Sequence, residues 1–395
     1  MSNPKIIAFY LPQFHPTPHN NEWWGKGFTE WTNVARATPL FKGHEQPHIP
    51  SELGFYDLRL PESRKEQAEL AKEYGIYGFC YWYYRFSKNN YELELPINEV
   101  LRTKEPDFPF MVCWCNESWH RKLWRFDGTF SSETLQEQKY GDSKDIEDFF
   151  YEVLPLFMDS RYIKIDDKPA FMFYKPKEVP NISNFMDIWN NLAKKEGLNG
   201  IFFIGYLTGE VKKDNSKSIK SKFKNFYNQK ETLQDDERQV LSMGVNAITI
   251  NRQDHVFIER NPLIHSIKYI YRKIRKIPRI IDYKKVINIM LDADYTPENV
   301  FPVVVPNWDH TPRSGYGGFV FQHSSPQLFK KYLIKILRII REKQKENQIV
   351  FLKAWNEWGE GNYIEPDLKW GRGYLEAISQ ALNETKNKVE DKDSI

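Results

Sequence analysis

Two carboxylates near the end of the chain have the clearest chemical potential. Glu357 and Glu360 lie in the segment WNEWGEGN, which also holds two tryptophans with flat apolar faces and two glycines that permit a tight turn. Paired carboxyl groups beside aromatic rings suit glycosidic-bond chemistry, in which one carboxyl transfers a proton and the other acts as a base or nucleophile. An ordinary solvated loop is the alternative. The tryptophans, and the apolar run directly before the segment, favour a catalytic pair.

Polar and aromatic side chains also follow most of the other apolar runs of the chain. Such clusters predict a carbohydrate-binding face, because Trp and Tyr combine a large apolar body with a polar handle. For Asp309 and Arg313 a mutual ion pair is an equal alternative, and for His15 a structural role is the main alternative. The residues that we expect to contact a substrate are Tyr10, Gln13, His15, Trp31, Tyr81, Trp82, Asn116, Glu117, Trp308, Asp309, Arg313, Asn356 and Trp358.

The elements that must position these residues alternate along the chain. Short apolar runs read as buried strands, and segments of helical periodicity separate most of them. This alternation predicts an α/β protein, a (β/α)8 barrel of the TIM type, whose chemistry lies at the carboxyl ends of its strands. A doubly wound open sheet is the competing architecture, but PQFHP follows the first run where that fold would have a glycine-rich phosphate turn. The expected strands are 5–11, 77–84, 108–115, 169–174, 200–207, 245–250, 300–305 and 349–354, and the clearest helices are 61–74, 143–157, 182–196 and 326–344.

The composition limits the class of protein. The 395 residues carry 56 basic and 53 acidic side chains, a formal net charge of +3, which argues against a nucleic-acid partner. The three cysteines, Cys80, Cys113 and Cys115, lie in apolar runs, which predicts buried free thiols and a reducing compartment. No run is long enough to span a membrane, and the N-terminus shows no apolar signal core. We therefore expect a cytoplasmic protein.

We expect one catalytic domain at 1–382 with a basic insertion at about 255–290, followed by a charged, disordered tail at 383–395. Within the insertion, lysines and arginines at 265–285 alternate with isoleucine and tyrosine. Such an amphipathic segment either contacts an anionic membrane surface or packs its isoleucines on the barrel, and the sequence favours neither. Asp292 and Asp294 match the D-x-D pattern of metal-dependent sugar transferases, but the pattern is short and follows no predicted strand. We expect neither a metal nor another cofactor.

Five segments carry a resemblance to a known family. They are YLPQFHPTPHNNEWWGKGFTEWTNV, YGFCYWYY, CWCNESW, PNWDHTPR and WNEWGEGNYIEP, and together they span residues 10–366. The chain resembles the WbsX-like family of polysaccharide-biosynthesis proteins, which is related to glycoside hydrolase family 99, the endo-α-mannosidases. The first and last segments are long and the most specific.

The resemblance implies a (β/α)8 barrel that acts on glycosidic bonds with net retention of configuration. The hydrolase family has its catalytic pair in a motif similar to NEWGEG, so the roles carry over to Glu357 and Glu360. Glu357 would act as a base on the sugar 2-hydroxyl and help to form an intramolecular epoxide. Glu360 would protonate the departing oxygen and then activate the acceptor.

Three functions remain open at this point. We expect a glycosyltransferase of O-antigen or other cell-surface polysaccharide biosynthesis. It would work in the cytoplasm or at the inner face of the membrane. Its substrate would be an oligosaccharide or polysaccharide, either free or linked to a lipid. A retaining endo-glycoside hydrolase of the endo-α-mannosidase type is the first alternative. A glycan-binding barrel without catalytic activity is the second, although binding alone would not require the carboxylate pair.

Overall fold

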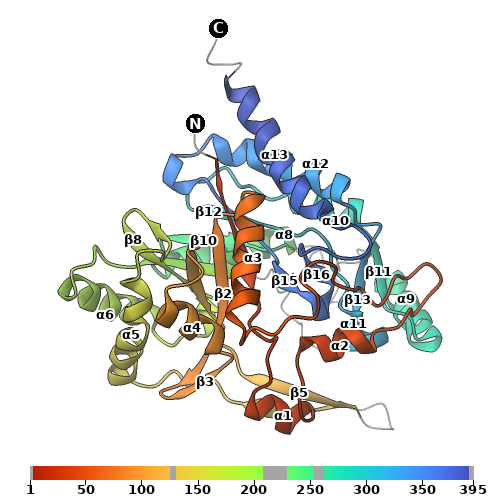
Figure 1. Cartoon of the computed structure of the whole chain (residues 1–395), viewed down its shortest axis with the longest axis horizontal. Coiled ribbons are helices and arrows are strands. Elements are labelled where there is room, and N and C mark those ends of the chain that lie inside the picture. The colour runs from red at the N-terminus through yellow and green to blue at the C-terminus, as the bar shows by residue number, and fades with distance from the viewer. Residues whose placement is uncertain (1–2, 125–129, 208–228, 253–255, 257–261, 391–395) are drawn as a thin grey trace.

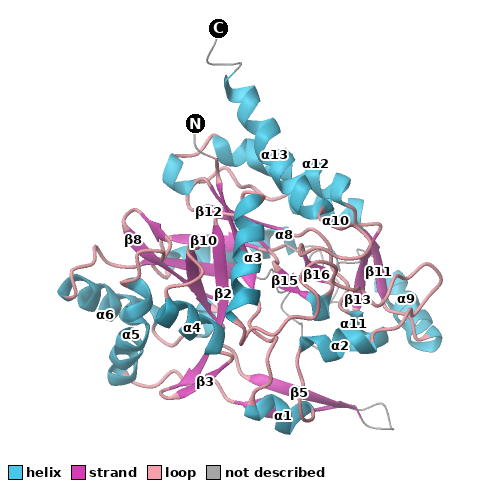
Figure 2. Ribbon diagram, viewed as in Figure 1, coloured by secondary structure: helices cyan, strands magenta, loops and turns pink. Residues whose placement is uncertain are grey.

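Eight parallel strands form a closed barrel at the centre of the protein (Figures 1 and 2). The computed structural model describes residues 3–124, 130–207, 229–252, 256 and 262–390. The barrel strands follow one another around the barrel in chain order, and β1 pairs with both β2 and β14, which closes the sheet. The predicted (β/α)8 barrel is therefore confirmed. Its strands are β1 (Lys5–Tyr10), β2 (Gly78–Ser87), β4 (Phe110–Trp114), β8 (Lys168–Phe173), β9 (Phe202–Leu207), β10 (Ala247–Ile250), β12 (Val300–Val304) and β14 (Ile349–Leu352).

Helices surround the barrel, and the four that the sequence predicts most clearly are present as α3, α5, α6 and α12. Local chemistry fixes their starts: Asp142 caps α5 by accepting from the amides of residues 144 and 145, and Ser325 caps α12. The helices are α1 (Pro18–Trp24), α2 (Glu30–Arg36), α3 (Pro61–Glu73), α4 (Leu95–Thr103), α5 (Ser143–Phe157), α6 (Ile182–Lys195), α8 (Gln229–Ser242), α9 (Pro262–Arg275), α10 (Tyr283–Leu291), α11 (Thr311–Ser314), α12 (Pro326–Arg341) and α13 (Gly373–Glu390).

Short elements occupy the loops that connect strands to helices. Some of them shape the carboxyl end of the barrel, where the loop after β14 forms a small hairpin. The short strands are β3 (Asn90–Glu92), β5 (Trp119–Trp124), β6 (Phe130–Gln136), β7 (Lys164–Ile165), β11 (Arg279–Asp282), β13 (Phe319–Gln322), β15 (Asn356–Glu357) and β16 (Asn362–Tyr363). The 3-10 turns are η1 (Pro176–Glu178), η3 (Gly315–Gly317), η4 (Lys345–Asn347) and η5 (Trp358–Glu360).

The end of the chain differs from the expectation of a disordered tail from residue 383. Helix α13 continues to Glu390, and only residues 391–395 lie outside the described residues. Thr385 is buried, donates to the carbonyl of Ala381, and accepts a hydrogen bond from Nε of Arg341 in α12. The charged composition of the tail gives no sign of this anchored face, and disorder of the residues beyond it stays a prediction.

The predicted basic insertion contains α9, β11 and α10, while 255 and 257–261 within it lie outside the described residues. Strand β11 pairs in parallel with β13, so the insertion is joined to the loop after β12. Among the helices in the described ranges, none is both long enough and apolar enough to cross a lipid bilayer.

An aromatic cluster fills the space between the barrel wall and helices α5 and α6. Trp189 of α6 is fully buried at its centre, with ring centroids 4.7 Å from both Phe171 of β8 and Phe185, and its Nε1 donates to the carbonyl of Ile146. Aromatic residues make up 15% of the chain. Those in this cluster belong to the core and not to a sugar-binding face.

We expect Trp189→Ala to destabilise the protein by about 3–5 kcal/mol, because truncation leaves a large cavity in a packed core. Denaturant unfolding followed by circular dichroism measures the change. Trp24→Ala is the matched control, since Trp24 is 42% exposed. Equal losses in the two variants would contradict the packing argument.

Candidate active site

The two motif carboxylates lie on a tight hairpin directly after barrel strand β14. Strands β15 and β16 pair antiparallel, and the 3-10 turn η5 joins them. Side chains three residues apart on such a turn lie on the same side, so those of Glu357 and Glu360 share one side of the hairpin. The side chain of Asn356 fastens the hairpin to the end of β1, because its Oδ1 accepts from Leu11 N at 2.7 Å and its Nδ2 donates to Leu11 O at 3.0 Å.

A second attachment comes from the end of β12. Asp309 N donates to the carbonyl of Glu360 at 2.8 Å. Gly361 makes this approach possible, because its φ is +52° and a Cβ at this position would lie 2.7 Å from the Asp309 Cβ. The Asp309 carboxylate is itself held by His44 Nε2 at 2.7 Å and by Gln46 Nε2 at 2.6 Å. Asp309 therefore positions the hairpin.

Glu357 is buried, with an exposed fraction of 3%, and three donor contacts surround its carboxylate. Trp82 Nε1 of β2 donates at 2.7 Å, and Lys353 Nζ donates to the two oxygens at 3.2 and 3.1 Å. The Lys353 ammonium lies 5.2 Å from the centre of the Trp82 ring and 4.9 Å from that of Trp308. Two indole faces and one carboxylate thus compensate for the burial of this cation.

Arg313 of α11 bridges Glu360 to a third carboxylate, Glu30 of α2. Its Nη1 contacts Glu360 Oε1 at 2.5 Å, and its Nη2 and Nε contact Glu30 Oε2 at 3.0 and 3.1 Å. The Glu30 carboxylate is 2% exposed. His310 Nε2 lies 3.7 Å from the same oxygen of Glu360. The site therefore joins residues from the loops after β1, β12 and β14.

The pKa values of the two motif carboxyls move in opposite directions. Burial raises the pKa of Glu357, against the charge of Lys353, and the nearby charge of Glu360 adds to the increase. Burial also opposes the charge of Glu360, but Arg313, His310 and Lys353 outweigh it and lower its pKa to about 2. The Glu357 side chain makes a smaller contribution to this lowering.

Several residues that the sequence predicts as substrate contacts do meet at this site. Trp82 and Trp308 flank Lys353, and Arg313 contacts Glu360. The alternative of an Asp309–Arg313 ion pair is wrong, because Asp309 pairs with His44 while Arg313 pairs with the two glutamates.

Tyr10 and Tyr81 lie elsewhere, in the layer between the barrel and α3. The Tyr10 hydroxyl donates to Gln67 Oε1 of α3 at 2.7 Å, and the Tyr81 ring lies 4.5 Å from the Tyr10 ring. Successive side chains of a strand point to opposite faces, and here the stacked pair of Phe9 and Trp82 takes the barrel interior. For β2 the sequence prediction placed both Tyr81 and Trp82 at the site, although neighbouring side chains of one strand point to opposite faces.

Three other residues predicted to contact a substrate form hydrogen bonds within the protein. Asn356 is fully buried against Leu11, as described above. Trp358 is 1% exposed, stacks on Tyr363 at 3.7 Å and donates to Glu365 Oε2 at 2.5 Å. Asn116 is fully buried and exchanges two hydrogen bonds of 2.8 Å with the backbone of Lys175. The bonds of these residues hold loops together, and their contact with a sugar stays a prediction.

The remaining predicted contacts lie around the loops after β1 and β4. Trp31 of α2 is partly buried, with its ring 5.6 Å from Trp358 and its Nε1 bonded to the Tyr56 carbonyl. The backbone carbonyl of Gln13 accepts a hydrogen bond from the backbone amide of Glu30. Burial lowers the pKa of His15, and the negative charge of Asp57 partly offsets this lowering. Glu117 pairs with Lys175 Nζ at 2.9 Å.

Sequence reasoning missed Lys353 and Glu30 as members of the site. A lysine directly after the apolar run 349–352 was the available signal for Lys353, because a cation at a barrel strand end needs a partner. Glu30 lies in the long loop segment NEWWGKGFTEWTNV without any local pattern that marks it. Only the fold brings it to Arg313.

Within the described ranges, no group of three or more histidine, cysteine, aspartate or glutamate side chains is placed to hold an ion. Asp292 ends α10, and Asp294 accepts bonds from the amide and hydroxyl of Thr296.

Comparisons with known proteins agree with this architecture. The family model described as glycosyltransferase WbsX matches residues 6–378. Two relatives, each described as uncharacterized protein WxcX, come from two strains of Xanthomonas campestris pv. campestris and are 31% identical over 383 residues. The match covers 95% of this chain and 49% of each relative, so the chain spans about half the length of these curated relatives.

Solved structures share the fold at low sequence identity. A glycoside hydrolase-like protein gives a TM-score of 0.54 at 13% identity, with 97% of this chain and 94% of that chain covered. The GH99 endo-alpha-mannosidase from Bacteroides thetaiotaomicron, in complex with Bis-Tris propane, gives a TM-score of 0.52 at 13% identity, with 98% of each chain covered. At these identities the likeness concerns the fold alone.

We expect Gly359→Ala to disrupt the charge cluster, because a Cβ there would lie 1.8 Å from Glu30 Oε2. Pushing Glu30 away from Arg313 breaks a buried ion pair, which costs about 3–5 kcal/mol of unfolding free energy. Denaturant unfolding measures the loss. Gly317→Ala, which has open space around the new Cβ, is the control. A Gly359→Ala variant as stable as Gly317→Ala would refute the close contact of Glu30 with the turn.

Proposed function

Because the chain belongs to the glycosyltransferase WbsX family, we propose that it is a carbohydrate-active enzyme with Glu357 and Glu360 as its catalytic carboxyl groups. One observation carries this proposal. Two carboxyls three residues apart lie at the carboxyl end of a barrel, that of Glu357 4% exposed and that of Glu360 14%, each against its own cation. In barrels of this type the strand ends hold the chemistry. A protein that only binds glycans has no need of such a costly buried pair.

The charges around the pair favour one bound proton. Three carboxylates, those of Glu30, Glu357 and Glu360, contact two cations, Lys353 and Arg313. A proton shared by the close pair makes this cluster neutral, and burial favours the neutral cluster. His310 is a further titratable neighbour of Glu360. The site thus has a source for the proton that a departing glycosidic oxygen requires.

We propose that this proton moves from Glu357 to Glu360 during the reaction. Arg313 contacts Glu360 but has Glu30 as a second partner, so it can release Glu360 without losing its ion pair. Meanwhile Trp82 and Lys353 stabilise the Glu357 anion. The roles in the proposal are then Glu357 as base on a sugar hydroxyl and Glu360 as proton donor. The proposed order of roles, with Glu360 acting first as acid and then as base, gives net retention of configuration.

We propose transfer to a sugar hydroxyl, in the biosynthesis of an O-antigen or other cell-surface polysaccharide with a lipid-linked substrate, as the biological reaction in the cytoplasm. The family description supports transfer. The buried free thiols of Cys80, Cys113 and Cys115 fit a reducing compartment. Retaining endo-glycoside hydrolysis is the second candidate, supported by the fold shared with an endo-alpha-mannosidase. Both reactions use the same pair, because water and a sugar hydroxyl are equivalent nucleophiles to a carboxylate base.

We expect Glu357→Gln and Glu360→Gln each to reduce turnover roughly 10²–10⁴-fold, because each removes a proton-transfer group. The assay uses aryl α- and β-glycosides with free acceptor sugars, and then nucleotide-activated and lipid-linked donors, with products identified by mass spectrometry and anomeric configuration by NMR. Glu376→Gln, on the exposed side of α13, is the matched control.

A transferred sugar would support transferase action, and a free reducing sugar would support hydrolysis. Two results would refute the proposal: unchanged turnover in the two site variants, or no turnover of any donor by a wild type that still binds glycans. Net inversion of configuration would reject the proposed retaining mechanism alone.

We expect Glu30→Gln to move the alkaline limb of the kcat/KM profile to lower pH by roughly one unit. Without the Glu30 charge, Arg313 interacts with Glu360 alone. This favours the form in which both Glu357 and Glu360 are ionised, so the proton that they share is lost at lower pH. Turnover measured across pH 4–9 tests this at roughly half-unit steps. Glu376→Gln should leave the profile unchanged. A limb that stays in place or moves to higher pH would show that Glu30 does not act through Arg313.

A further inference from the structure

Helix α9 presents large apolar side chains to solvent. Ile267 is 67% exposed, Ile270 is 55% and Ile274 is 74%. They recur at positions i, i+3 and i+7, so they lie on one face of the helix. This observation counts against the alternative in which the isoleucines of the basic segment pack on the barrel, because these three are exposed. Single exposed apolar residues are ordinary, but three on one helical face mark an interaction surface.

The charges of the same segment have one sign. Between Pro262 and Arg279 the sequence contains no aspartate or glutamate and six lysines and arginines. Lys273, Arg275 and Lys276 are all exposed at the carboxyl end of the helix, beside Ile274. An exposed apolar face with cations on its borders matches a surface that is apolar below and anionic above, which is the interface of an acidic lipid bilayer.

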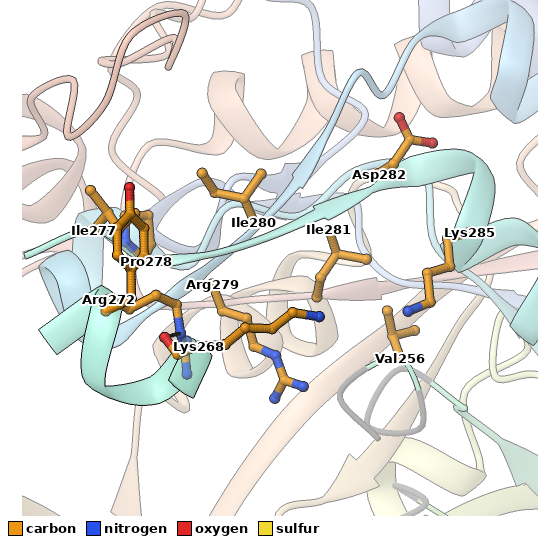
Figure 3. A pocket seen from close by; sticks show the side chains of 11 residues that line it. Val256, Lys268, Arg272, Ile277, Pro278, Arg279, Ile280, Ile281, Asp282 and Lys285 are labelled. Atoms are coloured by element: carbon orange, nitrogen blue, oxygen red, sulfur yellow. Dashed lines mark hydrogen bonds between the residues drawn. The ribbon is translucent and has the colours of Figure 1, made fainter. Parts of the chain in front are cut away.

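The helix also covers a cationic hollow of about 300 Å³. Lys268 and Arg272 of α9, Arg279 of β11 and Lys285 of α10 line it together with apolar side chains such as Ile281. Figure 3 shows the side chains of Lys268, Arg279 and Lys285 on one side of the β11 ribbon and that of Asp282 on the other. Phosphate groups of a lipid surface fit such basic walls.

The surface lies near the carboxyl end of the barrel. Strand β11 pairs with β13, and β13 contacts the loop that holds Asp309 and Arg313, through the bond from His310 N to the carbonyl of Phe319. Figure 1 shows α9 at the same side of the molecule as α11 and β13. A membrane under α9 would therefore lie beside the proposed active site.

We propose that α9 docks the protein on an anionic phospholipid surface, with Ile267, Ile270 and Ile274 inserted among the lipids and the flanking cations on their phosphates. Docking is a property of this surface and does not depend on glycan chemistry. A variant that no longer docks should therefore still turn over a water-soluble substrate.

Vesicle flotation tests the proposal with the full chain. Phosphatidylcholine vesicles with phosphatidylglycerol should carry the protein upward, and pure phosphatidylcholine vesicles should not. The triple variant Lys273→Gln/Arg275→Gln/Lys276→Gln should bind at least roughly tenfold more weakly, and so should Ile267→Ser/Ile270→Ser/Ile274→Ser. Lys331→Gln/Lys335→Gln/Arg338→Gln, which removes the same charge from the exposed side of α12, should bind like the wild type. Equal losses in both cation triples, or no flotation of the wild type, would overturn the proposal.

A fluorescence probe separates membrane insertion from other contacts. The three natural cysteines are buried, so an environment-sensitive thiol dye should label Ile274→Cys selectively, and Lys335→Cys is the control. On acidic vesicles the emission of the first should shift to shorter wavelength, and that of the second should not. A vesicle-free dimer that the serine triple variant converts to a monomer would identify a second copy as the occupant of this face and overturn the proposal.

Discussion

The balance of buried charge at the end of β14 is the constraint on which the rest of the site depends. Glu30, Glu357 and Glu360 are almost withdrawn from water, and a buried carboxylate is tolerated only where cations and donors replace its hydration. Arg313 and Lys353 supply this replacement from different loops. Each loop must therefore adopt a conformation that brings its charge to the centre, and the charges in turn hold the loops together.

The aromatic residues make this arrangement possible in more than one way. Trp82 gives Glu357 a hydrogen bond, while the rings of Trp82 and Trp308 shield the Lys353 ammonium. Beneath the hairpin, Trp358 donates to Glu365, and burial raises the pKa of that carboxyl to about 7. The indole groups thus act as donors and low-dielectric walls within the protein. The sequence predicts that the aromatic side chains at the strand ends contact a sugar. Several of them instead contact groups within the protein.

The fold could be predicted almost completely from the sequence, and the site only in part. Eight apolar runs indicated the barrel because strands covered on both faces must be continuously apolar. The carboxylate pair could be found because its two members lie three residues apart. Glu30 could not, since its partner Arg313 is 283 residues away and no local pattern marks the contact. Tyr10 and Tyr81 were misplaced for a related reason: a side chain one position away from an interior residue points to the opposite face.

The positions of the site and of α9 bear on whether such a pair transfers sugars or hydrolyses them. In the proposed reaction a carboxylate base activates any hydroxyl that reaches the sugar, so the pair itself would not choose between water and an acceptor. The choice must come from how often an acceptor, compared with water, occupies the adjacent space. A protein held at a membrane surface meets lipid-linked acceptors at the high effective concentration of a tethered reaction. Under the docking proposal, the exposed isoleucines of α9 would therefore influence the outcome of the chemistry without touching the reacting atoms.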